Sequence, residues 1–188
     1  MTTTTTPPAP RGSAPHGSTP RSRTNPNVAV RDFGSLMLDG PDLDRIPWCD
    51  SPRLPGLFSK TLLYNPDTGT AVSLTKVEKG AILPLHVHWG EAMVVVLKGR
   101  FSYEPTGSVG AGGFGYEAFG VVHEPDFPAD EETIFYVFST SHGILQFYNE
   151  DGSPGAISHI RDRLLYIRQR CGEAGVAHLN LPDWYWEG

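Results

Sequence analysis

Residues 80–99 read GAILPLHVHWGEAMVVVLKG, an apolar and β-branched stretch that carries two histidines one residue apart. Such a composition predicts strands at 82–88 and 92–98. Alternate residues of a strand point to the same face, so His86 and His88 place both imidazoles on one side of the sheet. A metal held by this pair needs a third ligand from elsewhere, and His123 is the candidate. The pair by itself also fits ordinary surface or core histidines.

Short strands separated by turns extend from this stretch in both directions. Residues 65–69 form a turn in which proline fixes φ and glycine tolerates a positive φ. About eight strands are expected, at 58–64, 70–77, 82–88, 92–98, 100–104, 114–119, 133–139 and 143–148. The series predicts an all-β sandwich or barrel at about 56–150, in which 107–115 forms a flexible hairpin loop.

One amphipathic helix is predicted after the strands, at 157–171. Its apolar stripe consists of Ile160, Leu164, Ile167 and Cys171. Ser158 is the expected N-cap, and Gly172 is expected to end the helix. The remaining feature is a set of arginines that lie mostly off the stripe and are interpreted as a solvated face: Arg161, Arg163, Arg168 and Arg170.

The N-terminal residues 1–30 are rich in Thr, Pro, Ser and Arg and contain almost no large apolar side chain. They bury too little surface to offset the entropy of ordering, so we expect a disordered tail. Residues 31–188 are long enough for a single domain with its own core. Trp184 and Trp186 are expected to dock on the barrel or on a second subunit.

Charge and composition limit the classes of partner. The 188-residue chain has a formal net charge of −6, although residues 1–31 contain four arginines and no acidic residue. The rest is therefore more acidic still, which disfavours nucleic-acid binding. No stretch approaches the roughly 20 apolar residues of a membrane span, and no secretory signal is present, so a cytoplasmic protein is expected. Cys49 and Cys171 lack zinc-site spacing and form either free thiols or one disulfide.

The two histidine regions resemble the two sequence motifs of the cupin superfamily. The residues in register with the first motif are Gly80, His86, His88 and Gly99. Those in register with the second are Gly112, Gly120 and His123. The resemblance implies a single cupin domain, a double-stranded β-helix or jelly-roll barrel, that binds a metal through His86, His88 and His123.

The glutamate position of the first motif is occupied by Ala92. Glu91 lies one residue earlier, and strict strand alternation turns its side chain away from the histidine face. A local bend would let Glu91 serve as a fourth ligand or catalytic residue, but three histidines are the favoured set. His142 precedes a strand at a turn, where a turn or surface position is favoured over a role as ligand or base.

A longer part of the chain, about 46–176, resembles one cupin subgroup, the 2,4′-dihydroxyacetophenone dioxygenases. The acetylacetone-cleaving cupins are near relations. The segments that carry the resemblance are Ile46–Trp48, Pro66–Thr70, Leu145–Tyr148 and the arginine-rich helix. It implies a non-haem Fe(II) that cleaves a C–C bond of a small ketone with O2, the ketone being a hydroxyacetophenone or a β-diketone. A homo-oligomer, dimer or tetramer, is also expected.

Three neutral imidazoles suit this chemistry because they leave the metal its full positive charge, which stabilises a bound enolate. They also accept Zn, Ni, Mn or Cu, so the metal is not determined. Each ligand needs an acceptor on its other nitrogen. The candidates for that role, which the sequence does not rank, are Glu91, Glu117, Gln146 and Tyr148.

Two other functions stay open at this point. One is a metal-binding sensor or ligand-binding cupin, such as the zinc cupin of anti-sigma factors, although the N-terminal region has no cysteine ligand. The other is a metal-dependent isomerase or lyase that does not use O2. Oxygen consumption during turnover separates these from a dioxygenase.

Overall fold

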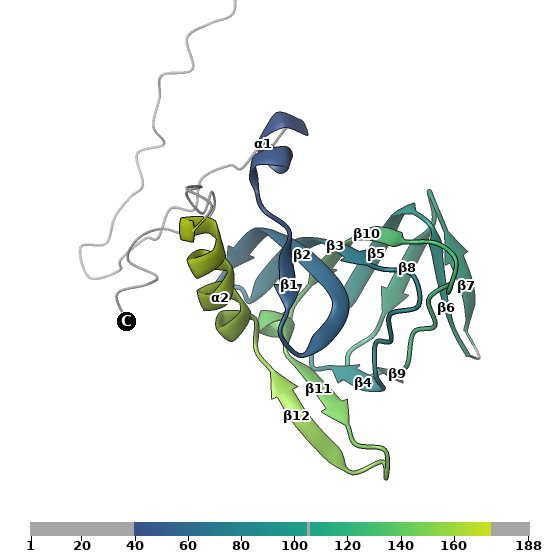
Figure 1. Cartoon of the computed structure of the whole chain (residues 1–188). Helices are drawn as coiled ribbons and strands as arrows, with labels where there is room; N and C mark the ends of the chain where they lie inside the picture. Colours follow the sequence, from purple (N-terminus) through teal and green to yellow (C-terminus); the bar gives the residue numbers. More distant parts are fainter. Residues whose placement is uncertain (1–39, 105, 174–188) are drawn as a thin grey trace, which may run out of the picture. The chain divides into compact units, whose positions relative to one another are not determined.

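The computed structural model describes residues 40–104 and 106–173. The predicted tail at 1–30 and the two C-terminal tryptophans lie outside these residues. The described chain begins with a short helix, α1 (Gly40–Arg45), and ends with α2 (Ile160–Glu173). Between them lie one 3-10 turn, η1 (Ser141–Gly143), and the strands β1 (Cys49–Ser51), β2 (Leu54–Asn65), β3 (Thr70–Val77), β4 (His86–His88), β5 (Ala92–Lys98), β6 (Arg100–Tyr103), β7 (Gly107–Gly110), β8 (Phe114–Glu117), β9 (Val122–His123), β10 (Thr133–Ser139), β11 (Leu145–Tyr148) and β12 (Pro154–Ser158) (Figure 1).

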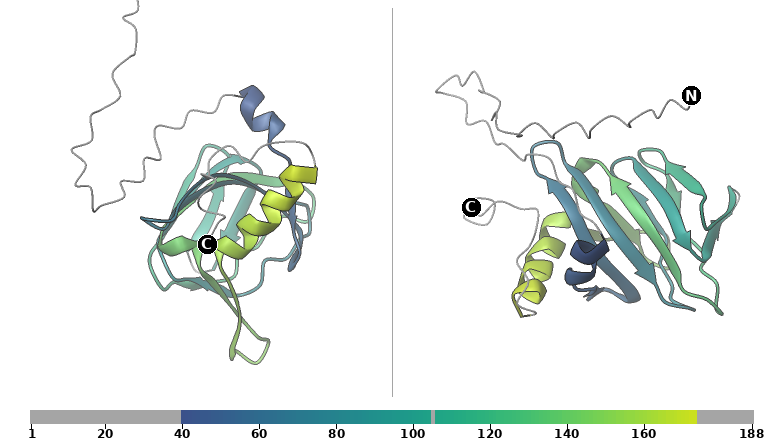
Figure 2. Two further views of the ribbon diagram at one scale, coloured as in Figure 1. Left: turned by 90° about the vertical axis from the view of Figure 1, so that its left-hand side faces the viewer. Right: turned by 90° about the horizontal axis from the view of Figure 1, so that it is seen from above.

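The strands form two antiparallel sheets that curve around a common interior. One sheet has the order β1-β2-β3-β10-β5-β8, and the other has the order β12-β11-β4-β9. Helix α2 lies at one end of the barrel, and the separate β6–β7 hairpin lies at the other end (Figures 1 and 2). This arrangement confirms the predicted all-β barrel with a C-terminal helix. No helix in the described ranges is long and apolar enough to cross a membrane.

Strand alternation decides which side chains fill the interior. In β3, for example, every second residue is buried, and its last inward residue, Val77, is 1% exposed. The main core cluster combines aliphatic and aromatic side chains: Val77, Val94, Val96, Phe101, Phe127 and Phe135. Four of these residues belong to the larger sheet, Phe101 belongs to β6, and Phe127 lies in the loop between β9 and β10, so this core packs the larger sheet against the β6–β7 hairpin and that loop.

Several predicted boundaries differ from those in the structure. The strand expected at 82–88 is limited to His86–His88, and the loop expected at 107–115 contains β7 and the start of β8. The helix starts at Ile160 rather than at 157, because the preceding residues form β12, in which Ser158 pairs with Leu145 of β11. It also continues past Gly172 to Glu173. The apolar stripe itself is confirmed, since all its members are buried.

Gly99 forms the turn between β5 and β6 under two constraints. Its φ is +71°, and a Cβ at this position would lie 2.5 Å from the carbonyl oxygen of Glu132. We expect Gly99→Ala to lower the free energy of unfolding by more than about 2 kcal/mol, because positive φ and steric overlap both oppose a side chain. Gly112→Ala is the matched control, since its φ is +81° but nothing lies within 4 Å. Urea unfolding measures both variants, and equal losses would contradict the steric part of this explanation.

Candidate metal centre

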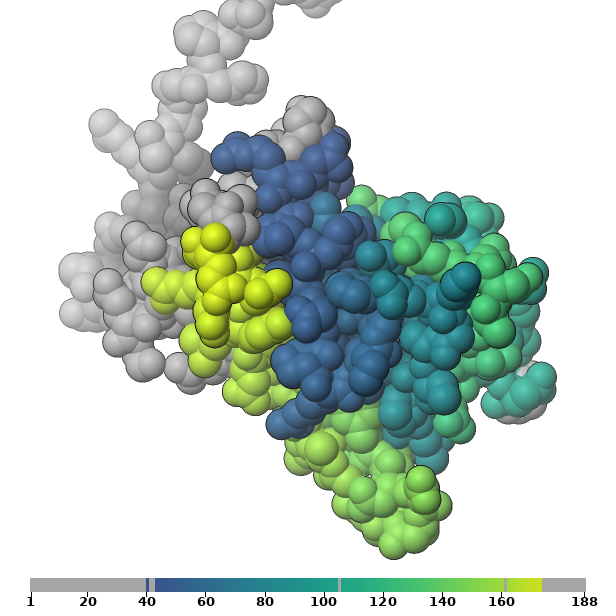
Figure 3. Space-filling view, in the orientation of Figure 1, coloured from purple at the N-terminus to yellow at the C-terminus, as the bar shows by residue number. Residues whose placement is uncertain are grey.

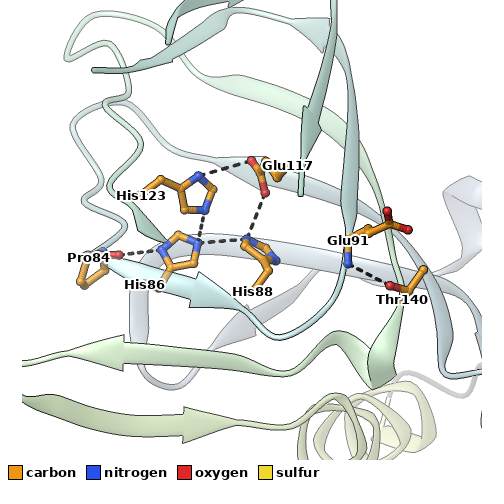
Figure 4. A network of polar contacts seen from close by, with 7 residues as sticks. All are labelled: Pro84, His86, His88, Glu91, Glu117, His123 and Thr140. Carbon is orange, nitrogen blue, oxygen red and sulfur yellow. Dashed lines mark hydrogen bonds and ion pairs between the residues drawn. The ribbon is translucent and has the colours of Figure 1, made fainter. Parts of the chain in front are cut away.

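Three histidines converge because of strand pairing in the smaller sheet. His86 and His88 share one face of β4 by alternation, and His123 of β9 pairs directly with His86. The Nε2 atoms of His86 and His123 are 2.9 Å apart, and those of His86 and His88 are 3.2 Å apart. His86 is 2% exposed and His123 is 6% exposed. All three histidines that the sequence singled out therefore meet at one buried point (Figure 4).

A hydrogen bond on the far side of His86 determines which of its nitrogens faces the centre. The Nδ1–H of His86 donates to the carbonyl oxygen of Pro84 at 2.7 Å, which leaves the lone pair on Nε2. The Nδ1 of His123 is buried and lies 3.5 Å from Oε1 of Glu117, beyond the range of a hydrogen bond. Both imidazoles thus turn Nε2 towards the common point.

The spacing of these nitrogens fits a divalent metal ion. Metal–nitrogen bonds of about 2.1 Å at right angles place neighbouring ligand atoms about 3 Å apart. The two Nε2 separations, 2.9 and 3.2 Å, lie close to this value. Imidazole nitrogens are also ligands that Zn, Cu, Fe and Ni accept.

Burial keeps the three imidazoles neutral. Burial lowers the pKa of His86. Burial, together with the charges of neighbouring histidines, lowers the pKa of His88 to about 3 and that of His123 to about 4. Protons therefore do not compete for the ligand nitrogens near neutral pH. Metal binding is compatible with this charge state.

Glu117 is the carboxylate that the structure brings to the centre. It lies on β8 directly opposite Ala92 of β5, the residue that occupies the glutamate position of the first motif. Its Oε2 lies 3.2 Å from Nε2 of His88, and its side chain is 6% exposed. Burial raises its pKa to about 7. Glu117 is one of the four residues that the sequence offers as hydrogen-bond acceptors for the histidines. No sequence pattern indicates that it lies opposite Ala92.

The other candidates lie elsewhere. Glu91 precedes β5 and is exposed, and its Oε1 accepts a hydrogen bond of 2.6 Å from the Tyr116 hydroxyl. Its carboxylate points away from the histidines in Figure 4. The Nδ1 of His142 bonds to the Tyr64 hydroxyl at 2.8 Å. The structure therefore brings neither residue to the cluster. Gln146 accepts from the indole N–H of Trp89 at 3.1 Å.

The centre opens into a cavity of about 230 Å³ inside the barrel. His86, His88, His123 and Glu117 all line it. Most of the remaining lining near the core is apolar or aromatic and includes Leu57, Leu83, Val94, Phe101, Phe127, Phe135 and Phe147. A small ligand with an apolar body and oxygen donors suits such a lining.

A jelly-roll barrel with a three-histidine centre is the arrangement of cupins, and comparison with known proteins agrees. The ChrR cupin-like domain matches residues 40–142, which is more than half of the chain. The chain therefore belongs to the ChrR cupin-like domain family. No curated protein is similar enough in sequence to count as a match.

Solved structures show the same fold. An RmlC-like cupin protein from Ralstonia eutropha is 22% identical, with a TM-score of 0.67 over 76% of this chain and 90% of that chain. A candidate acetylacetone dioxygenase from Methylibium petroleiphilum is 25% identical, with a TM-score of 0.58 over 69% and 94% of the two chains. An acetylacetone dioxygenase from Acinetobacter johnsonii is 18% identical, with a TM-score of 0.62 over 76% and 96%.

Proposed function

We propose that this protein is a non-haem iron dioxygenase that cleaves a C–C bond of a small ketone with O2. The observation that carries the proposal is the buried convergence of three neutral imidazoles, with the buried Glu117 carboxyl beside them. Similarity to the candidate acetylacetone dioxygenase of Methylibium petroleiphilum supports it. His86, His88 and His123 are the proposed ligands, and a β-diketone or hydroxyacetophenone is the proposed substrate type.

The bound Fe(II) would supply a Lewis acid and an O2-binding centre. The Pro84 carbonyl accepts the Nδ1–H of His86 and so keeps the Nε2 lone pair of His86 towards the centre, where the Nε2 atoms of His88 and His123 also lie. The aromatic lining excludes water and receives the apolar part of the ketone.

Glu117 is the group of this site that can accept a proton. A β-diketone must lose a C–H proton to become an enolate. The Glu117 carboxyl lies in the cavity next to His88, and burial holds its pKa at about 7. A carboxyl with this pKa exchanges protons readily near neutral pH. We therefore assign the enolising proton to a Glu117 oxygen.

A metal-binding sensor is the second candidate, and the family match favours it. The matching family takes its name from ChrR, and an anti-sigma ChrR is also among the solved structures with a related fold. In a sensor, the same centre and cavity would bind a metal or ligand without turnover.

Metal content and O2 uptake distinguish these functions. Protein purified without oxygen and loaded with Fe(II) is mixed with acetylacetone or with hydroxyacetophenones, and O2 is followed with an electrode. We expect one iron per chain and O2 uptake that depends on the ketone. Bound metal with no O2 uptake for any of these ketones would contradict the dioxygenase and favour a sensor. Ketone consumption without O2 uptake would instead indicate an isomerase or lyase.

A further inference from the structure

Arg163 is a cation that faces the barrel interior. It lies near the start of α2, three residues after Ile160 and four before Ile167, both of which are buried. This spacing turns Arg163 towards the same side of the helix. Its Nη2 donates a 2.7 Å hydrogen bond to Oγ of Ser59, which is 3% exposed. The interpretation of Arg163 as part of a solvated face is therefore wrong, whereas Arg168 and Arg170 are exposed.

The packing of α2 against the first strands holds Arg163 in this position. In Figure 3 the helix lies directly against the chain around β1 and β2. Ile167 and Cys171 cluster with Cys49 of β1, and the Tyr166 hydroxyl donates to Oδ1 of Asp50 at 2.6 Å. Before Arg163, Ile160 clusters with Tyr64 of β2. Contacts before and after Arg163 thus anchor the helix, and the guanidinium has a defined place.

Arg163 and the three histidines line the same cavity. The wall next to Arg163 carries hydroxyls at inward positions where a barrel usually buries apolar side chains. Ser59 pairs with Thr75 across β2 and β3, and Ser73 is the next inward residue of β3. All three residues are buried and line the cavity. One part of the cavity is therefore polar and cationic, and the rest is largely apolar.

Among the side chains that the structure describes, no carboxylate forms an ion pair with Arg163. Asp50 and Asp162 also line the cavity, but both are exposed to solvent. Burial lowers the pKa of Arg163, yet a guanidinium stays protonated. Arg163 is partly exposed, so its charge is partly removed from water, and an anion inside the cavity offsets the cost of that desolvation.

We propose that Arg163 binds a carboxylate of the substrate, so that the preferred substrate is an oxo acid. Its ketone oxygens face the three-histidine centre, and its carboxylate pairs with the guanidinium, whose fork matches a planar carboxylate. The cavity of about 230 Å³ suits a small acid. Only the assignment of the ketone to the metal centre rests on the proposed function.

Equilibrium binding tests this assignment without turnover. The probe is 4,6-dioxoheptanoate, which is acetylacetone extended at one end by a carboxymethyl group, and its neutral methyl ester is the control ligand. Calorimetry on protein loaded with redox-inactive Zn(II) measures both affinities. A charge-assisted hydrogen bond stabilises binding by about 1.5–3 kcal/mol, so we expect the acid to bind at least about tenfold more tightly than the ester. Equal affinities in the wild-type protein would overturn the proposal.

Two variants test whether Arg163 is the residue that causes the preference for the acid. Arg163→Met removes the charge but keeps an extended side chain, and we expect it to lose the preference for the acid while its affinity for neutral acetylacetone changes less than about twofold. Arg168→Met is the matched control on an exposed part of the same helix, and it should keep the preference. A preference that survives in Arg163→Met or disappears in Arg168→Met would refute the assignment. Because binding is measured without O2, absence of dioxygenase activity leaves this test intact.

Discussion

His123→Ala is expected to weaken metal binding by more than about 100-fold. Loss of an outer-shell partner alone costs a metal site 10–100-fold, and this variant removes one of three ligands. His123 cannot be replaced by a neighbour, because it is the residue of β9 that faces His86, at an Nε2 separation of 2.9 Å. Two remaining imidazoles on β4 hold a metal ion less tightly and without the facial geometry that an open catalytic position needs.

Thermal or urea unfolding with added metal measures the loss directly. A ligand at 100 times its dissociation constant stabilises the native protein by about 2.7 kcal/mol, whereas a variant with 100-fold weaker binding gains only about 0.4 kcal/mol at the same concentration. His142→Asn is the control, because His142 bonds to Tyr64 outside the cluster and asparagine tolerates its φ of 61°. Equal metal-dependent stabilisation of wild type and His123→Ala would show that the three histidines are not the site.

Glu117→Gln is expected to change how the stability of the metal-free protein depends on pH. Burial raises the pKa of Glu117 from 4.5 to about 7 in the folded state, so the folded protein binds more protons than the unfolded chain between these values. Stability from this group is therefore fully present below about pH 4.5 and decreases as the pH rises to about 7. At 1.36 kcal/mol per unit, the loss approaches about 3 kcal/mol. Glutamine keeps the shape of the side chain but has no such titration.

The difference between the two proteins isolates Glu117. The histidines have lowered pKa values and act in the opposite direction, but they are present in both proteins. Urea unfolding with a chelator at pH 5, 6.5 and 8 should show Glu117→Gln gaining up to about 3 kcal/mol relative to wild type as the pH rises. Bound metal favours the ionised carboxylate, so loading should reduce this gain. A difference that does not change with pH would refute the burial of an ionisable Glu117.

The three proposed ligands can be found in the sequence because each depends on a local rule. Alternation places His86 and His88 on one face, and the second cupin motif identifies His123. The turn at 65–69 also follows from its residues, and Gly69 has the expected positive φ of 69°. The stripe of α2 was correct because helical spacing alone defines it.

The ends of helices and strands are harder to predict from the sequence where pairing with another strand decides them. Residues 154–158 form β12 because β11 offers a free edge to the segment, and no local pattern distinguishes this strand from the first turn of the helix. The β7 strand within the glycine-rich loop exists because β6 lies opposite it. In both places, hydrogen bonds to the other strand of a hairpin override weak local preference.

The all-β class, the helical stripe and the choice of the three histidines follow from the amino-acid sequence, because strand alternation, helical spacing and motif register can be recognised without the fold. The folded chain was needed to show that Glu117, rather than Glu91, lies beside the histidines, because that depends on the register between β5 and β8. The same is true of Arg163. Its place in the cavity depends on which side of α2 packs against β1 and β2, and contacts between residues more than 100 positions apart determine that side.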